Sequence, residues 1–446
     1  MNSRERARRG NRRTKTTWMF SVLLLALVGS TSREAAAEIP IAKANGWELS
    51  ADGRFNTFVS FLTGDHQPPG VPIWSGGVDE KDAGTGTISS LRIRSGFVMN
   101  VFGFNLVKHI TPDLKLTGRF ATWVGISQDR SKLDDPSFDA RELYVKLEGP
   151  WGGLLAGRNL GIFERGALMM DYEIFHANGL GFPCSVQSVH GGACGFAGHG
   201  LLYTGFNAGV VYNTPDLAGF QLTAGIFDPV AITERTYNIT PLPRVEAELT
   251  FNLAGHLKVF GDVLWQRVSN ENPLKDPTTM MPILDANGKT QKQTVDATGY
   301  AAGAAITAGP LQVGGAFFTG KGLGLTVPMD NTPLFADEQG VLRRGQGYVG
   351  MASLTFGETK LAGGAGVSQM KMTSSESEPF ASLDIPKQQL GISVGFYQGF
   401  YKTFTWALEY FRGQYQWYDY KPDAMSDVTH PTQNVNIINT GITVIW

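Results

Sequence analysis

The sequence has no long apolar run beyond its first 40 residues, and it has few charged residues. No later segment holds 18 consecutive apolar residues, so none is a candidate for a membrane-spanning helix. Charged residues make up 17% of the 446 residues, against about 25% in ordinary soluble proteins. Yet the mean hydropathy is only −0.10, and 55 residues are glycine. This combination is typical of strands that alternate between lipid and water in a membrane barrel.

Catalytic and metal-binding motifs are also scarce. None of the seven histidines stands in a His-Glu-x-x-His arrangement, which would place two zinc ligands and a general base on one helix. We therefore predict no catalytic residue, no metal and no cofactor. Scattered serine and histidine side chains leave one alternative open, a hydrolase site like that of the smaller outer-membrane phospholipases.

The first 37 residues differ from the rest of the chain. A basic region ends at Lys15, an apolar run extends from Trp18 to Gly29, and three alanines precede Glu38. This order predicts a secretory signal peptide over residues 1–37, because the apolar run is too short for a membrane anchor. The segment holds eight basic and two acidic residues, so its removal changes the net charge from −2 to −8. An acidic balance argues against nucleic acid as a partner.

Only two cysteines occur, Cys184 and Cys194. In an exported chain this predicts one disulfide bond. The alternative is a Cys/His metal site with His190 and His199, although the spacing fits no familiar zinc pattern. Both cysteines lie in the stretch Asn159–Phe206, which is glycine-rich and too apolar for a disordered segment. We expect an ordered loop that is folded onto another part of the molecule.

Alternation of apolar and polar residues begins at Trp47. From Trp47 to Phe61 the odd positions are nearly all apolar and the even positions nearly all polar, so the two sets lie on opposite faces of a strand. By the same alternation we expect one shared face for Leu91, Ile93, Phe97, Met99 and Val101, and the other for Arg92, Arg94 and Asn100. Later strand candidates are 115–126, 140–148, a short strand that ends at Arg158, and then 208–212, 219–227, 244–252, 256–268, 295–308, 311–319, 346–357, 359–372, 388–399, 402–420 and 434–446.

Short and long connections between these strands alternate strictly. The long ones are 63–87, 128–139, 159–205, 228–242, 269–294, 320–345, 373–386 and 421–433. An antiparallel barrel with this order has all long loops at one rim and all turns at the other, as outer-membrane barrels do. We therefore predict an all-β, transmembrane, antiparallel barrel of about sixteen strands over residues 38–446. It would have short periplasmic turns, long extracellular loops and a water-filled lumen.

Aromatic residues are placed as a membrane interface requires. The chain ends on Trp446, which shares a face with Ile438 and Val444 in the last strand. A soluble protein has little reason to end on an exposed tryptophan, whereas the last strand of a barrel does. We expect a second part of the aromatic girdle at Tyr415, Trp417, Tyr418 and Tyr420, with ordinary core packing as the alternative.

The chain resembles a Gram-negative general porin over nearly all of residues 47–446. The resemblance rests on the run Glu142–Arg158, the very long third loop, the run Val211–Phe220 and the terminal Trp446. It implies an outer-membrane homotrimer, surrounded by lipid and lipopolysaccharide, through which small hydrophilic solutes and ions diffuse passively. It also implies that the third loop, at about 159–205, folds into the lumen as a constriction. A recognisable Pro-Glu-Phe-Gly-Gly segment is missing from this loop, which leaves its path and the pore width open.

The resemblance further implies that arginines of the wall face acids of the third loop. Candidates for the basic side lie on the polar faces of the predicted strands, namely Arg54, Arg92, Arg94, Arg119 and Arg158. Candidates for the acidic side are Glu164, Asp171 and Glu173. Charged rings of this kind set ion preference in channels. The alternative is that the arginines only neutralise lumenal acids and hold the loop. A structural or adhesive barrel, with its role in the long loops, is a further alternative function.

Overall fold

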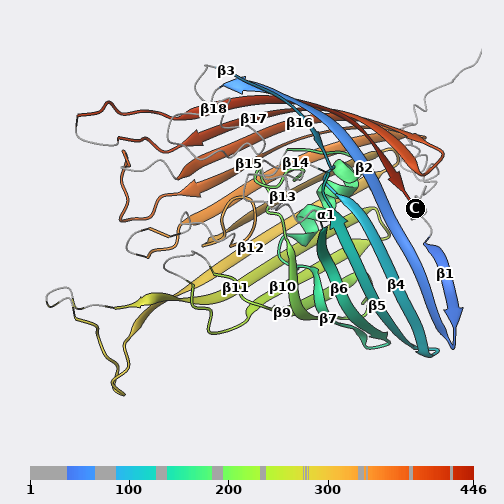
Figure 1. Ribbon diagram of the computed structural model, residues 1–446, viewed down its shortest axis with the longest axis horizontal. Helices are drawn as coiled ribbons and strands as arrows, with labels where there is room; N and C mark the ends of the chain where they lie inside the picture. Colours follow the sequence, from blue (N-terminus) through green and yellow to red (C-terminus); the bar gives the residue numbers. More distant parts are fainter. Residues whose placement is uncertain are drawn as a thin grey trace, which may run out of the picture. The chain divides into compact units, whose positions relative to one another are not determined.

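Residues that alternate between apolar and polar in the sequence build a closed antiparallel barrel. The computed structural model describes residues 38–65, 87–126, 138–182, 194–231, 238–274, 276, 279, 281–329, 336–337, 340–380, 385–421 and 425–446. In this part of the chain, sixteen strands follow one another around the wall (Figure 1). The last strand pairs with the first, with Ile438 opposite Phe61, so the barrel wall is closed. The predicted fold class and strand number are confirmed.

The strands keep chain order around the wall, and two of the elements named below are successive parts of one wall strand. In the first half of the wall they are β2 (Trp47–Asp65), β3 (Thr87–Arg94), β4 (Asn100–Thr111), β5 (Leu114–Val124), β6 (Phe138–Gly149), β7 (Gly152–Leu160), β8 (Phe206–Asn213) and β9 (Phe220–Phe227). In the second half they are β10 (Arg244–Leu253), β11 (Leu257–Pro273), β12 (Lys292–Ala308), β13 (Leu311–Lys321), β14 (Arg344–Phe356), β15 (Thr359–Lys371), β16 (Pro386–Phe400), β17 (Phe404–Trp417) and β18 (Thr432–Ile445). A short strand, β1 (Ile39–Ala44), forms a hairpin with the start of β2.

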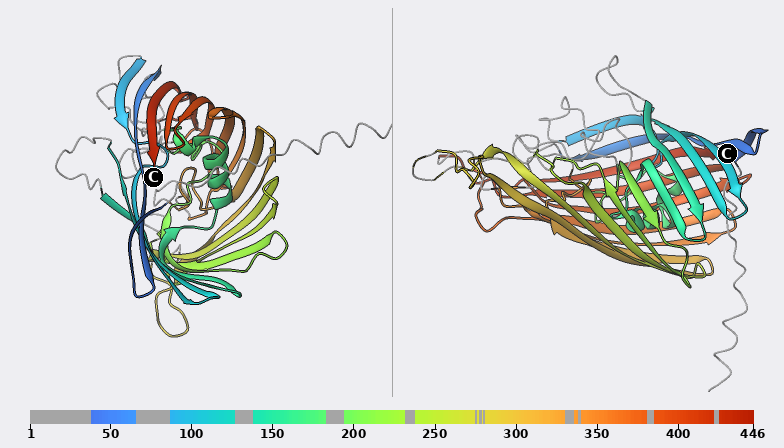
Figure 2. Two further views of the ribbon diagram at one scale, coloured as in Figure 1. Left: turned by 90° about the vertical axis from the view of Figure 1, so that its right-hand side faces the viewer. Right: turned by 90° about the horizontal axis from the view of Figure 1, so that it is seen from below.

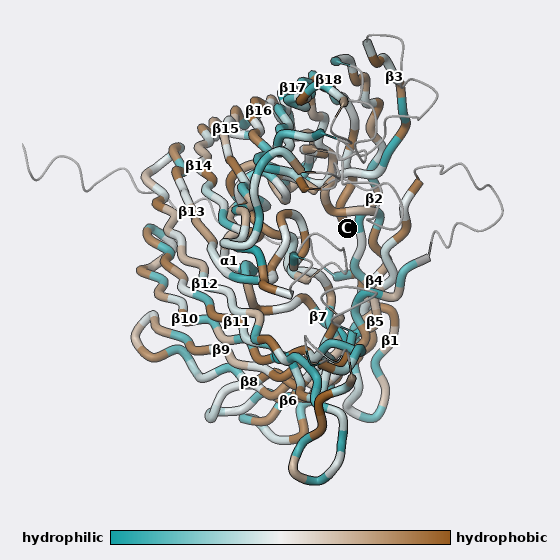
Figure 3. Tube along the Cα trace, turned by 90° about the vertical axis from the view of Figure 1, so that its left-hand side faces the viewer, coloured by the Kyte–Doolittle hydropathy of each residue, from teal (hydrophilic) through white to brown (hydrophobic). Residues whose placement is uncertain are grey.

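The two faces of the wall have opposite chemistry. On β2, Val59 and Phe61 are each 42% exposed, whereas Phe58 and Ser60, at the alternate positions, are buried. Hydrophobic and hydrophilic residues alternate along the strands around the barrel (Figure 3). The exposed large apolar side chains form a belt on the outside. Burying this belt in lipid stabilises the barrel, because each apolar side chain removed from water contributes about 1.5–3 kcal/mol.

One predicted face is wrong in its second half. Leu91 and Ile93 point outward as expected, but Phe97, Met99 and Val101 are buried. The cause is a break between β3 and β4, which pair with successive halves of β2 and together make one wall strand. The break shifts the alternation by one residue, so Phe102 and Phe104 become the outward residues of β4. The amide of Phe97 donates to the carbonyl of Gly179 at 2.8 Å, so the break lies against a lumenal loop.

The two predictions for the aromatic residues have different outcomes. Trp446 lies beside Phe102 on the outer face, with ring centroids 6.0 Å apart, and its backbone is paired with Gly53. Tyr415 and Trp417, however, are each only 3% exposed, and so belong to the core rather than to a girdle. They lie on the inner face of β17, where a folded loop covers them. None of the helices in the described residues is both long and apolar enough to cross a membrane.

Candidate functional site

The described parts of the third loop, residues 161–182 and 194–205 between β7 and β8, lie inside the barrel (Figure 2). They contain the helix α1 (Arg165–Ile174) and a short 3₁₀ helix, η2 (His176–Asn178). The helix packs Met170 and Ile174 over Gly314 of β13, where a Cβ atom would lie 2.5 Å from the Met170 sulfur. The expected ordered loop is confirmed, whereas the helix is not visible in the sequence. A stretch of ten residues with a glycine at its second position has a weak helix preference, so tertiary packing has to stabilise the helix.

Carboxylates of the wall hold the start of the loop. Glu246 of β10 accepts hydrogen bonds from the amides of Ile162 and Phe163, at 2.7 and 2.9 Å. Asp262 of β11 accepts one from the amide of Glu164, at 2.9 Å. Negative groups at this end of α1 also complement the helix dipole. The wall therefore supplies the acceptors that the amides before the helix would otherwise lack.

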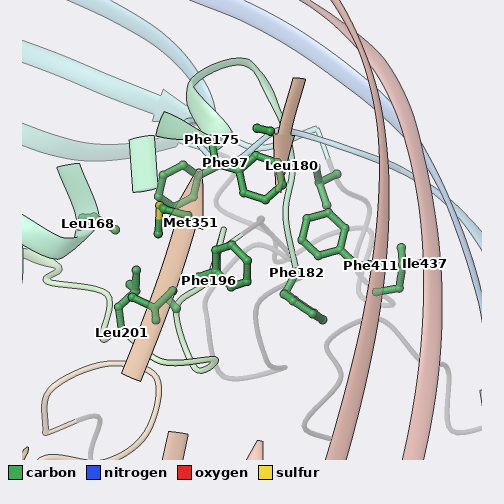
Figure 4. Close-up of a cluster of buried hydrophobic side chains, with 14 of the residues drawn as sticks. Phe97, Leu168, Phe175, Leu180, Phe182, Phe196, Leu201, Met351, Phe411 and Ile437 are labelled. Carbon is green, nitrogen blue, oxygen red and sulfur yellow. The ribbon is translucent and has the colours of Figure 1, made fainter. Parts of the chain in front are cut away.

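Aromatic side chains anchor the middle and the end of the loop (Figure 4). Phe175, Phe182 and Phe196 are fully buried and gather against Phe411 of β17. The rings of Phe182 and Phe411 meet edge to face, with centroids 4.7 Å apart. His199 stacks on Phe182 at 3.8 Å and contacts the hydroxyl of Tyr415 through Nε2 at 3.1 Å. The burial of this cluster attaches the loop to the β14–β18 side of the wall.

Polar contacts add to this attachment. Glu409 of β17 accepts hydrogen bonds from the amide of Leu180 at 2.9 Å and from the hydroxyl of Tyr397 at 2.5 Å. Lys360 of β15 donates to the carbonyl of Glu173 at 3.0 Å, near the end of α1 where a cation is favourable. Within the loop, Asp171 contacts Nδ1 of His176 at 2.5 Å and accepts from the amide of Phe196 at 2.9 Å. The described parts of the third loop are thus held at both ends and at several points between them.

Burial shifts the pKa of several ionisable groups in this loop, and for two of them it decides the charge at pH 7. The fully buried carboxyl of Glu164 has its pKa raised from 4.5 to about 8, although a hydrogen bond from the amide of Leu202 opposes the shift. The same cause lowers the pKa of His199 from 6.5 to about 3. Both groups are therefore neutral at pH 7, because a charge without a compensating partner is costly in a low-dielectric interior.

The space open to water lies on the other side of the lumen. Several inner-face side chains on β12, β13 and β17 are fully covered, with Ala297, Phe318 and Phe411 all at 0% exposure. In contrast, the Arg119 and Lys146 side chains on β5 and β6 are 16% and 29% exposed. The loop therefore fills one half of the barrel and leaves the half bounded by β4–β7 hydrated. A further cavity of about 280 Å³ lies between α1 and β10–β13.

The hydrated wall carries a network of charges. Arg119 donates to Asp52 at 2.6 Å, to Asn105 at 2.9 Å and to Glu142 at 3.1 Å. Arg54 of β2 reaches the loop, where it donates to the carbonyl of Ala177 at 2.5 Å and to the hydroxyl of Tyr172 at 3.2 Å. A barrel with a folded inner loop and a charged, hydrated wall on the opposite side can conduct water-soluble molecules.

A comparison with protein families decides the class. The family model described as Gram-negative porin matches residues 23–332. The chain belongs to the Gram-negative porin family. It is an outer-membrane channel for passive diffusion, and family and fold are those of a channel rather than an enzyme. No curated protein matches the sequence.

Solved structures agree on the fold of this porin. The outer membrane channel DcaP of Acinetobacter baumannii has a TM-score of 0.62 at 13% identity, over 90% of this chain and 99% of the other. An anion-selective porin from Comamonas acidovorans has a TM-score of 0.57 at 14% identity, over 90% and 100%. OmpF of Salmonella typhi in complex with daunomycin has a TM-score of 0.53 at 16% identity, over 92% and 100%. At these identities the likeness shows the fold alone.

The porin's predicted arginines do not all lie on one face. Arg54, Arg92, Arg94 and Arg119 are on the inner face, since they stand opposite buried or lumenal residues in the register. Arg158 instead stands opposite Leu143, which is 59% exposed. Directly opposed residues share a face, so Arg158 lies on the outer face of β7, 3.9 Å from Asp139. The prediction that Arg158 is lumenal missed the register of β7, which is too short for a clear alternation.

The porin's loop acids have structural partners. Glu164 and Asp171 are both fully buried in the contacts described above. Glu173 is 40% exposed, and its carboxylate accepts from Nζ of Lys258 at 2.6 and 2.7 Å.

Cys194 is buried at 4%, whereas Cys184 and His190 lie outside the described residues, so the disulfide stays a prediction. In the described part of the chain, no three His, Cys, Asp or Glu residues are grouped as a metal site.

Sequence reasoning missed one cluster at the hydrated wall of the porin. Arg141 lies over the rings of Trp123 at 5.1 Å and Phe206 at 5.7 Å, and it donates to the hydroxyl of Tyr203 at 3.1 Å. Arg141 occupies a bulge in β6, which removes it from the alternation of apolar and polar residues, so this alternation does not reveal it.

A Gly-x-Ser-x-Gly run also occurs at 391–395, but it lies within β16 and its Ser393 is only 1% exposed. It therefore lacks the exposed strand-to-helix turn of a hydrolase nucleophile.

Proposed function

We propose that the charges of the lumen make this channel weakly selective for anions among small hydrophilic solutes. The observation that supports this most is the group of inner-face arginines on β2 and β3, namely Arg54, Arg92 and Arg94. The side chain of Arg54 is bonded to a carbonyl and a hydroxyl rather than to a carboxylate. Its charge therefore stays uncompensated by these two contacts. Rings of cationic side chains favour anions in a pore.

The acidic side of the constriction is weaker than the family resemblance implies. Glu164 is buried and neutral at pH 7, and Asp171 is used within the loop by His176 and Phe196. Glu173 is the exposed acid of the three, and Lys258 offsets its charge. Arg119 is itself balanced by Asp52 and Glu142. The arginines of β2 and β3 would then determine the sign of the field, although Arg54 and Arg94 are only 6% and 5% exposed and Arg92 is the more exposed of the three.

The test is the reversal potential of the purified porin in planar bilayers under a salt gradient. We expect a wild-type potential of anionic sign, and a shift toward cations in the Arg92→Gln and Arg94→Gln variants. Arg158→Gln is a matched control, because this arginine lies on the outer face of the wall. An unchanged potential in the two test variants would refute the role of these arginines. A protein that conducts nothing would refute the channel itself.

Assembly and export complete the proposal. We propose a homotrimer in the outer membrane, in contact with lipid and lipopolysaccharide, and export by a signal peptide at residues 1–37. The family supports the trimer, and a structure of similar fold, OmpT of Vibrio cholerae, is known in a trimer form. Conductance steps in multiples of three, and a mature N-terminus at Glu38, are the expected observations.

A further inference from the structure

A second loop also enters the barrel. Residues Gly322–Met329, which we call the inner segment of the sixth loop, follow β13 and turn into the lumen. Leu323 is fully buried, and Leu325 and Met329 are each 2% exposed. Gly322 and Gly324 have φ of 69° and 87°, which allow the chain to turn here without strain. Backbone bonds from Gly322 to the Arg343 carbonyl and from Met329 to the Leu323 carbonyl fix the turn, at 3.0 and 2.9 Å.

The wall has a notch for this segment. Gly299 of β12, Gly320 of β13 and Gly345 of β14 stand opposite one another in consecutive strand pairs and form a row without side chains. A Cβ at Gly320 would lie 2.4 Å from a methyl of Leu323, and one at Gly345 would lie 2.6 Å from the carbonyl oxygen of Gly324. Leu264 and Met370, both buried, stand at the two ends of the row. The row thus receives Leu323 between larger apolar neighbours.

The inner segment also holds the third loop. Leu323 and Leu325 share a buried cluster with Phe163 and Leu202, which belong to the two ends of the third loop. The amide of Tyr203 donates to the carbonyl of Thr326 at 2.6 Å. The hydroxyl of the same tyrosine accepts from Arg141 on the hydrated wall. A chain of contacts therefore runs from the sixth loop through Tyr203 to the side of the barrel that stays open to water.

We propose that the inner segment of the sixth loop is a second determinant of pore size, which narrows the lumen and positions Tyr203 of the third loop. This inference rests on the proposed function as a diffusion channel. The segment fills the β11–β15 side of the lumen. Without it, the two ends of the third loop would be uncovered on this side. Water and solutes are thereby confined to the side bounded by β4–β7, where Arg141 and Tyr203 meet.

Two variants test this without altering the β-strand pattern. Leu323→Ala removes the side chain from the notch. Gly345→Ala fills the notch, since the nearest atom to its new Cβ is the Gly324 carbonyl oxygen at 2.6 Å and the next, also of Gly324, is at 3.7 Å. Gly350→Ala on the same strand is the matched control, because nothing lies within 4 Å of its Cβ. Heat-modifiable migration in electrophoresis confirms that each barrel is folded.

The readouts are hydrogen exchange of the peptide that contains Tyr203, and the size limit for exclusion of graded polyethylene glycols from the conducting pore. We expect faster exchange and a limit shifted toward larger polymers in both test variants, with no change in Gly350→Ala. Unchanged exchange in both test variants would overturn the support of Tyr203. Faster exchange with an unchanged limit would overturn the control of pore size. A silent wild-type channel would refute the proposed function instead, and the exchange data would still decide whether the segment holds the third loop.

Discussion

The neutral carboxyl of Glu164 makes the attachment of the third loop depend on pH. The side chain is fully buried, and one of its oxygens accepts from the amide of Leu202. Its other oxygen and Oδ1 of Asp262 are both buried and find no hydrogen-bond partner in the described part of the chain. The ionisable groups nearby are Asp262, Glu248 and Arg165. A negative charge on Glu164 would therefore be added beside other acids in a place without water.

The sign and size of the effect follow from the raised pKa. Because burial raises the pKa of Glu164 from 4.5 to about 8, its contribution is fully present below pH 4.5 and is lost as the pH rises through 8. Each tenfold change in proton concentration across this window changes the free energy of loop attachment by about 1.4 kcal/mol. Between pH 5 and pH 9 the attachment should weaken by on the order of 4 kcal/mol. The barrel itself should stay folded, because the loss concerns the first turn of the loop.

The assay is the open-channel current noise of single channels from pH 5 to pH 9. We expect the noise of the wild type to grow with pH as the start of the loop detaches. Glu164→Gln keeps the acceptor for Leu202, adds donors toward Asp262 and cannot ionise, so its noise should stay flat. Glu358→Gln, in the exposed turn after β14, is the control and should behave like the wild type. Parallel pH profiles for the wild type and Glu164→Gln would refute the reasoning.

Two further predictions concern the fixed path of the third loop. Gly366→Ala on β15 would place a Cβ 1.9 Å from the carbonyl oxygen of His199, so it should displace the loop and raise the conductance. Gly363→Ala on the same strand is the control and should leave the conductance unchanged, because the nearest atom to its new Cβ is 3.5 Å away. Equal conductances of the two variants would contradict this. Cys184 and Cys194 should form a disulfide bond, which a non-reducing digest would show as a linked peptide pair. Cys194→Ser should increase the current noise. Two free thiols in the mature protein would contradict the predicted disulfide.

The class of the barrel could be predicted from local patterns in the sequence. Alternation along β2 and around the wall indicated one lipid face and one lumenal face, because side chains of a strand point alternately to its two sides. The alternation of long and short connections then predicted sixteen strands with one looped rim, as found. The same reasoning placed Arg54, Arg92, Arg94 and Arg119 on the inner face correctly. These features are local or periodic, and so they can be read without knowing which strands meet.

The filling of the lumen depends on tertiary contacts that the sequence pattern does not reveal. The burial of Glu164 and Asp171, the packing of Tyr415 and Trp417 under the third loop, and the entry of Leu323 into a glycine notch all join residues far apart in the chain. No periodicity marks such contacts, because each depends on the closed barrel bringing β10–β18 around the loop. Breaks in the pattern had the same origin. The parity change before β4 and the bulge at Arg141 arise where the wall adapts to the loop it encloses, and there the alternation rule alone fails.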